Sequence, residues 1–241
     1  MALKTIQYKG QNFSISYEVV NPDKKRDIAF LHGWGSNKEL MKGVFAARLN
    51  EFRHIYIDLP GFGKSSCSTV LTTDDYTSIT ALFLSQINAD AEIVVGHSFG
   101  GKVALLLDPK LLVLVASAGI NRPKPLTVKF KIMLFKTLKF LGLGKLRSIF
   151  AAEDAKALSK EMYETFKIVV DEDMSGRFQA FKGRALLLWG DADTATPLES
   201  AEKIDALIED SRLVVYGGDH YFFMKHADEV CREIETEASG Q

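Results

Sequence analysis

The chain has 241 residues, of which 46% are hydrophobic and 25% charged, and its formal net charge is -1 at pH 7. This length suits one α/β domain with a sizeable core and an inserted subdomain. The nearly balanced charge gives no reason to expect nucleic-acid binding or stable membrane anchoring. The first residues lack the apolar core of a secretory leader, and the two cysteines, Cys67 and Cys231, lack a disulfide or metal spacing. We therefore expect a cytoplasmic protein with free thiols.

Strand and helix patterns alternate along most of the chain. Residues 13–19 alternate apolar and polar side chains, which predicts a half-buried antiparallel strand, and residues 28–31 form a continuous apolar run typical of a strand buried on both faces. Residues 36–39 fit a capping box that opens a helix. Further strands are predicted at 54–57, 93–95, 111–116, 185–189 and 213–216, and further helices at 76–88, 101–107 and 198–207.

This alternation predicts a mostly parallel central sheet with helices on both faces. The exception is the span 121–182, which has helical patterning and no convincing strand, although it separates two predicted buried strands. We therefore predict a core made of residues 1–120 and 183–241, with residues 121–182 inserted as a helical lid over one end of the sheet.

The sequence Gly96-His97-Ser98-Phe99-Gly100 lies between a predicted buried strand and a predicted helix. A serine between two glycines at a strand-to-helix turn is the pattern of a nucleophile elbow. Glycine allows the tight backbone turn and leaves the serine hydroxyl exposed at its tip.

Other reactive residues also follow predicted strands, where ligands bind in open α/β sheets. The segment His32-Gly33-Trp34-Gly35 follows strand 28–31. Two acids, Asp191 and Asp193, follow strand 185–189, and His220 follows strand 213–216. The chain order serine, aspartate, histidine is the order expected of an α/β-hydrolase triad.

These motifs, together with Asp58-Leu59-Pro60-Gly61-Phe62-Gly63-Lys64-Ser65, resemble those of the α/β-hydrolases along nearly the whole chain. The resemblance implies a serine hydrolase in which Ser98 is the nucleophile, His220 the general base and Asp193 the acid that orients His220. The backbone N–H groups of Trp34 and Phe99 would form the oxyanion hole. The implied reaction is hydrolysis of a small carboxylic ester, or of a related carbonyl compound, through an acyl-enzyme.

Each assignment has a rival in the sequence. Asp191 competes with Asp193, but residues 196–199 look like a helix start with Thr196 as the cap, which leaves Asp193 in the loop at the position of the acid. His226 competes with His220, but it lies in an amphipathic pattern and is interpreted as a helix residue. Gly61-Phe62-Gly63-Lys64-Ser65 ends like a phosphate-binding loop without its first glycine. No metal or cofactor is predicted.

The first half of the predicted lid is strongly basic. Residues 121–150 carry eight basic and no acidic side chains, interleaved with apolar ones. One interpretation is an amphipathic lid with solvated lysines; the others are an acidic partner such as a carrier protein, an anionic acyl substrate, or a transient membrane contact. The candidate partner-binding residues are Lys129, Lys131, Lys136 and Lys139.

Two subfamilies are most similar. Segments 32–39 and 58–65 resemble the pimeloyl-carrier-protein methyl ester esterases, which engage an acidic carrier through basic residues of a helical lid. The segment from His220 to Glu229 resembles the 2-hydroxy-6-oxo-dienoate (meta-cleavage product) hydrolases, which cleave C–C bonds with the same triad. A third alternative is a non-catalytic binding protein on this fold, since fold alone does not imply function.

Overall fold

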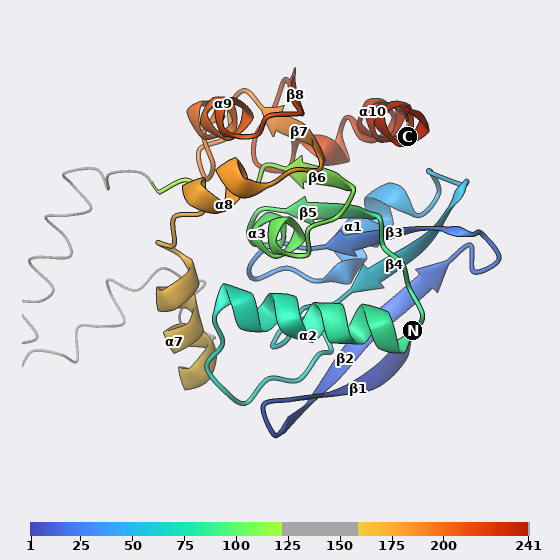
Figure 1. Cartoon of the computed structure of the whole chain (residues 1–241), viewed down its shortest axis with the longest axis vertical. Helices are drawn as coiled ribbons and strands as arrows, with labels where there is room; N and C mark the ends of the chain where they lie inside the picture. The colour runs from blue at the N-terminus through green and yellow to red at the C-terminus, as the bar shows by residue number, and fades with distance from the viewer. Residues whose placement is uncertain (122–158, 241) are drawn as a thin grey trace, which may run out of the picture.

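The computed structural model describes residues 1–121 and 159–240, and its centre is one eight-stranded sheet in the order β1-β2-β4-β3-β5-β6-β7-β8 (Figure 1). The pairs β1·β2 and β2·β4 are antiparallel, and all later pairs are parallel. The strands are β1 (Ala2–Tyr8), β2 (Gln11–Val20), β3 (Arg26–Leu31), β4 (Phe52–Ile57), β5 (Ile93–His97), β6 (Leu111–Val115), β7 (Arg184–Gly190) and β8 (Ser211–Tyr216).

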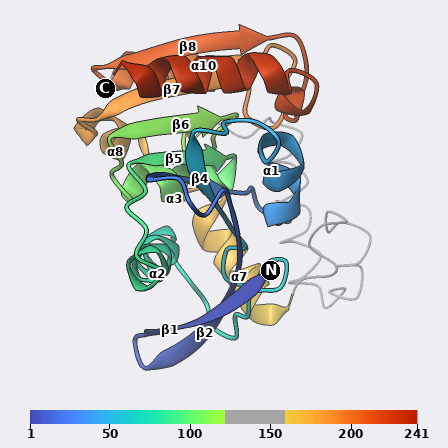
Figure 2. The ribbon, with the colours of Figure 1, turned by 90° about the vertical axis from the view of Figure 1, so that its right-hand side faces the viewer.

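Helices cover both faces of the sheet, as the alternating pattern predicts. Figure 2 shows α1 and α2 on opposite sides of the central strands. One apolar cluster packs α1 and α10 against the sheet, and the other packs α2, α3, α8 and α9 against the opposite face. The helices are α1 (Lys38–Phe45), α2 (Thr73–Gln86), α3 (Phe99–Leu106), α7 (Lys160–Val169), α8 (Ser175–Ala180), α9 (Leu198–Leu207), the 3-10 turn η2 (Phe222–Met224) and α10 (Ala227–Ser239).

The central strands β5 and β6 are buried on both faces. Every residue of β5 and β6 is buried, so these strands present continuous apolar runs instead of an alternating pattern. Strand β2 is antiparallel, in agreement with its alternating sequence. Since β3, β5, β6, β7 and β8 run in the same direction, their carboxyl ends meet at one edge of the sheet.

Strand β1 and one helix cap differ from the sequence-based expectations. Strand β1 was not predicted, because Ile6 is its one buried side chain and the strand is held at the sheet edge by its pairing with β2. The cap of α1 is Asn37, whose side chain accepts a hydrogen bond from the Glu39 N–H, so the expected capping box at Ser36 is wrong by one residue. The reason is that Lys38 is already helical, which places the cap directly before it.

A buried ion pair joins α1 to the loop after β4. Lys38 Nζ lies 2.8 Å from Asp58 Oδ2 and 3.1 Å from Ser16 Oγ, and the backbone N–H of Lys38 donates to Asp58 Oδ1. Burial alone would raise the pKa of Asp58, but the hydrogen bonds from Lys38 outweigh it and hold that pKa below its usual range. A Cβ at Gly63 would lie 2.4 Å from the Asp58 carboxylate. The glycine at this position, in the segment that ends like a phosphate-binding loop, therefore leaves room for the ion pair of Asp58 with Lys38.

We expect Lys38→Met to lower the free energy of unfolding by about 3–5 kcal/mol, because it leaves the Asp58 carboxylate buried without its cation. Urea unfolding followed by circular dichroism measures the change. Lys24→Met is the matched control: Lys24 pairs with Glu51 at the surface, 3.4 Å apart, and its loss should cost less than about 1 kcal/mol. Equal losses in the two variants would contradict this prediction.

Candidate active site

Ser98 lies at the turn between β5 and α3, with φ 51° and ψ -115°. This positive φ is unusual for a residue that carries a side chain, and such strain is concentrated at functional sites. The flanking glycines allow the turn to pack tightly: a Cβ at Gly96 would lie 2.5 Å from the Gly100 carbonyl oxygen, and one at Gly100 would lie 2.5 Å from that of Leu31. The glycine-serine-glycine pattern therefore reflects close backbone contacts around a turn in which Ser98 is partly exposed.

The structure brings Asp193 and His220 into direct contact. His220 Nδ1 lies 2.7 Å from Asp193 Oδ2, and the two residues come from the loops that follow β7 and β8. The other carboxylate oxygen, Oδ1, accepts hydrogen bonds from the backbone N–H groups of Ala195 and Thr196. Burial alone would raise the pKa of Asp193, but the hydrogen bonds from His220 and Thr196 hold it below its usual range. The carboxylate is thus ionised and oriented toward His220.

The rival residues have different contacts. Asp191 Oδ1 accepts a hydrogen bond from the Gly218 N–H at 2.9 Å, which ties the loop after β7 to the loop after β8. His226 precedes α10, and its Nε2 lies 3.0 Å from the Gly217 carbonyl oxygen. Both residues therefore support the loop that carries His220, whereas Asp193 contacts the His220 side chain itself.

Sequence reasoning missed the role of Thr196, which it interpreted as a helix cap. The cap position of α9 is Pro197 instead, with no side-chain cap. The Thr196 hydroxyl oxygen lies 2.8 Å from Asp193 Oδ2, 3.1 Å from the Ala116 carbonyl oxygen and 3.3 Å from His220 Nδ1. A threonine three residues after the acid was the available signal, but a threonine before proline is equally typical of a helix start.

His32 fixes the segment 32–35, in which the Trp34 backbone lies. Its Nδ1 donates to the Gly33 carbonyl oxygen at 2.8 Å, and its Nε2 accepts from the Leu59 N–H at 3.0 Å. Burial lowers the pKa of His32 to about 4, so the ring is neutral with the proton on Nδ1. Gly33 packs directly against the elbow, since a Cβ there would lie 3.0 Å from Ser98 Cβ and 3.0 Å from His97 Nδ1.

Aromatic rings surround Trp34 beside the elbow. Its ring centroid lies 4.8 Å from that of Phe62, 5.5 Å from that of Phe99 and 5.3 Å from that of Phe166. Phe166 belongs to α7, which Figure 1 shows beside the first turn of α2. Part of the segment predicted as a lid thus contributes an apolar side chain at the same end of the sheet as Ser98.

Helix α7 is anchored to the helix that follows Ser98. The buried Lys102 of α3 donates from Nζ to the Val169 carbonyl oxygen at 2.6 Å and to the Glu172 carbonyl oxygen at 3.0 Å. A cation at a helix C-terminus is favourable because carbonyl groups there lack partners. Burial lowers the pKa of Lys102 despite the opposing effect of Glu172.

Helices α7 and α8 occupy the described part of the predicted insertion, 121–182. The four candidate lysines, Lys129, Lys131, Lys136 and Lys139, lie outside the described residues, so their role stays a prediction.

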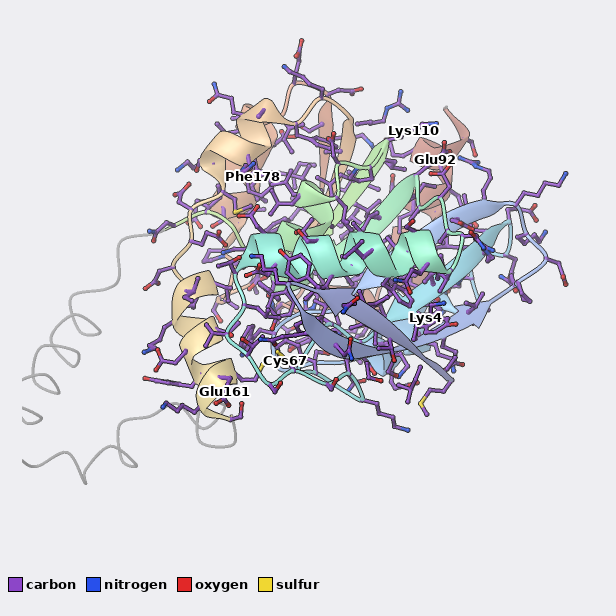
Figure 3. All side chains as sticks on the ribbon, turned by 60° about the horizontal axis from the view of Figure 1, so that its bottom comes forward. Lys4, Cys67, Glu92, Lys110, Glu161 and Phe178 are labelled. Carbon is purple, nitrogen blue, oxygen red and sulfur yellow. The ribbon has the colours of Figure 1, made fainter. Side chains whose placement is uncertain are left out.

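A charged surface hollow lies at the amino ends of the parallel strands, lined by Arg26, Glu92, Lys110, Arg184 and Asp210. Figure 3 shows its Glu92 and Lys110 far from Glu161 of α7. Because Ser98 and His220 follow the carboxyl ends of their strands, this hollow is separate from the candidate active site. Within residues 1–121 and 159–240, no cluster of metal-binding side chains is present and no helix is long and apolar enough to cross a membrane.

Comparison with known proteins agrees with this architecture. Residues 28–233 match the alpha/beta hydrolase family. The pimeloyl-[acyl-carrier protein] methyl ester esterase of Proteus mirabilis is 29% identical over 244 residues, which cover 87% of this chain and 91% of that protein.

Two solved structures share the fold. An esterase from Exiguobacterium antarcticum has a TM-score of 0.76 and 22% identity, with 98% of each chain covered. The meta-cleavage product hydrolase CumD has a TM-score of 0.71 and 18% identity, with 99% of this chain and 98% of the other covered. The resemblance expected from the sequence motifs is confirmed, and the chain belongs to the alpha/beta hydrolase family and is a hydrolase enzyme.

Proposed function

We propose that this hydrolase is a serine esterase that cleaves a carboxylic ester with Ser98, His220 and Asp193. The observation that carries the proposal is the 2.7 Å contact between His220 and Asp193, at the sheet edge that also carries the strained Ser98 turn. An aspartate that orients a histidine, at the same sheet edge as a serine in a strand-to-helix turn, is the constellation of serine hydrolases. Two sequence relatives, from Proteus mirabilis and Edwardsiella ictaluri, are named pimeloyl-[acyl-carrier protein] methyl ester esterases, which supports an ester as the substrate.

In the proposed reaction, Ser98 Oγ attacks the ester carbonyl carbon while His220 Nε2 takes the hydroxyl proton. The His220 Nδ1–H then donates to the ionised Asp193, which stabilises the imidazolium. Collapse of the tetrahedral intermediate breaks the ester C–O bond, and His220 returns the proton to the leaving alcohol. His220 then deprotonates a water molecule that attacks the acyl-enzyme carbonyl carbon. The bond between the acyl group and Ser98 Oγ breaks, His220 returns the proton to Ser98 Oγ, and the carboxylic acid is released.

The proposed oxyanion hole consists of the backbone N–H groups of Trp34 and Phe99. Phe99 is the first residue of α3, where an N–H group has no partner within the helix and the helix dipole favours negative charge. Trp34 follows Gly33, which packs against Ser98, so its backbone lies close to the nucleophile. Each such donor is typically worth about 3–4 kcal/mol of transition-state stabilisation.

We expect Gly33→Ala to lower kcat for ester hydrolysis about 100-fold, because the added methyl group would push the Trp34 backbone away from Ser98. Steady-state kinetics with a p-nitrophenyl ester measures the change. Gly43→Ala is the matched control, since a Cβ there meets nothing within 4 Å. A Gly33→Ala variant with unchanged kcat would contradict the placement of the oxyanion hole.

The substrate is proposed to present an apolar acyl chain, because the rings of Trp34, Phe62, Phe99 and Phe166 lie beside the elbow. A carrier-bound methyl ester, as in the names of the relatives, fits the basic residues predicted in the lid. The carbon–carbon hydrolase alternative needs the same three side chains, but beyond the resemblance of the segment from His220 to Glu229 its support is similarity of fold. The ester is therefore the preferred substrate class.

Labelling with a fluorophosphonate, combined with a substrate panel, tests the proposal. We expect the probe to attach to Ser98, as located by peptide mass spectrometry, and a p-nitrophenyl ester to be hydrolysed. A free methyl ester, a carrier-bound methyl ester and a dienoate, assayed in parallel, distinguish the substrate classes. A protein that is neither labelled nor active on any of them would support the binding-protein alternative and overturn the proposal.

A further inference from the structure

His97, the last residue of β5, lies between the nucleophile and the loop that carries the general base. The residue is 1% exposed, and its Nε2 lies 3.2 Å from the His220 carbonyl oxygen. Its Nδ1 faces Gly33 and has no hydrogen-bond partner among the described residues. Because a carbonyl oxygen can only accept, the ring proton belongs on Nε2, and His97 donates to the backbone of His220.

The ring of His97 also supports the turn that begins at His220. Its centroid lies 4.7 Å from the His220 ring, 5.4 Å from the Tyr221 ring and 5.0 Å from the Phe223 ring. An apolar side chain would fill this space without leaving a buried nitrogen unpaired. What the histidine adds to packing is therefore the single hydrogen bond to the His220 carbonyl.

We propose that His97 is a positioning residue that holds the His220 main chain at a fixed place relative to Ser98. This inference rests on the proposed function. His97 and Ser98 are consecutive, so the hydrogen bond connects the strand that carries the nucleophile to the loop that carries the base. Asp193 contacts the His220 side chain through Nδ1. Together the two contacts fix both the ring and the backbone of His220.

The His97 ring, which donates this hydrogen bond, is also neutral, and a neutral donor suits a position beside the general base. Burial and the neighbouring His220 lower the pKa of His97 to about 3. A charged donor, such as a lysine, would oppose the positive charge that develops on His220 during catalysis. A neutral imidazole provides the hydrogen bond without that repulsion.

The test compares His97→Leu with His97→Gln. Leucine fills the space without a donor, whereas the glutamine amide nitrogen reaches about as far along the side chain as imidazole Nε2. We expect His97→Leu to lower kcat for a p-nitrophenyl ester about 10–100-fold with KM within about twofold, because small misplacements of a reacting group have effects of this size. The rate of fluorophosphonate labelling should fall by the same factor, and His97→Gln should recover most of both rates. Thermal unfolding reports whether each variant is folded.

Equal losses in the leucine and glutamine variants, or unchanged kcat and labelling in His97→Leu, would show that His97 only packs. If the leucine variant does not fold, nitrogen NMR of the wild-type protein tests the inference instead. We expect a neutral His97 with its proton on Nε2 from pH 5 to pH 9. A proton on Nδ1 would overturn the inference. A wild-type protein that resists the fluorophosphonate overturns the proposed function instead, so the two failures are distinguishable.

Discussion

Replacement of Ser98 by alanine is expected to lower kcat for a p-nitrophenyl ester by about 10⁴–10⁶-fold, because the proposed acyl-enzyme forms on the Ser98 hydroxyl group. The residual rate would come from the oxyanion hole and substrate binding, which remain intact without the hydroxyl group. The measurement is steady-state hydrolysis, together with the loss of fluorophosphonate labelling.

The fold should survive this substitution, since the side chain of Ser98 is partly exposed and its backbone contacts are made by N–H and carbonyl groups. Ser78→Ala is the matched control: its hydroxyl donates to the Asp74 carbonyl oxygen on α2, and its removal should leave kcat unchanged. A Ser98→Ala variant that keeps more than about 1% of wild-type activity would contradict the proposed nucleophile.

The candidate site could be predicted from the sequence because its residues depend on the positions of strand ends. Buried parallel strands are continuous apolar runs, so the ends of β5 and β7 can be recognised. The edge strand β8 is only partly buried, but its short apolar run 213–216 marks its end as well, and Ser98, Asp193 and His220 each follow one of these three strands. Parallel strands bring those ends to one edge of the sheet, which makes Asp193 and His220 neighbours although they are 27 positions apart in the sequence. The contact between Asp193 and His220 then follows from topology.

Contacts that depend on the direction of a polar side chain could not be predicted in this way. Thr196 has the sequence context of a helix cap, but the loop geometry turns its hydroxyl toward Asp193. Lys38 begins an amphipathic helix and looks like a solvent-exposed residue, yet it is buried against an aspartate 20 residues away. In both cases the local sequence pattern is compatible with two orientations of the polar side chain, and tertiary contacts determine which orientation is adopted.

Asp193→Asn is expected to lower kcat about 10⁴-fold, although an amide has nearly the shape of the carboxylate. The backbone N–H groups of Ala195 and Thr196 both point at Oδ1, so they would hold the amide oxygen there and turn the amide NH₂ toward His220. His220 Nδ1 would then have to accept a hydrogen bond, which places the ring proton on Nε2. In that tautomer Nε2 has no lone pair for the Ser98 proton, and the general base is lost.

Asp191→Asn is the matched control for that substitution, on the same loop and with the same chemical change. Its oxygen can still accept the hydrogen bond from the Gly218 N–H, so the loop that carries His220 keeps its support and kcat should stay within about twofold of wild type. If Asp191→Asn loses activity and Asp193→Asn keeps it, Asp191 is the acid of the triad. If both variants stay active, neither Asp191 nor Asp193 sets the tautomer of His220, and the proposed role of Asp193 is overturned.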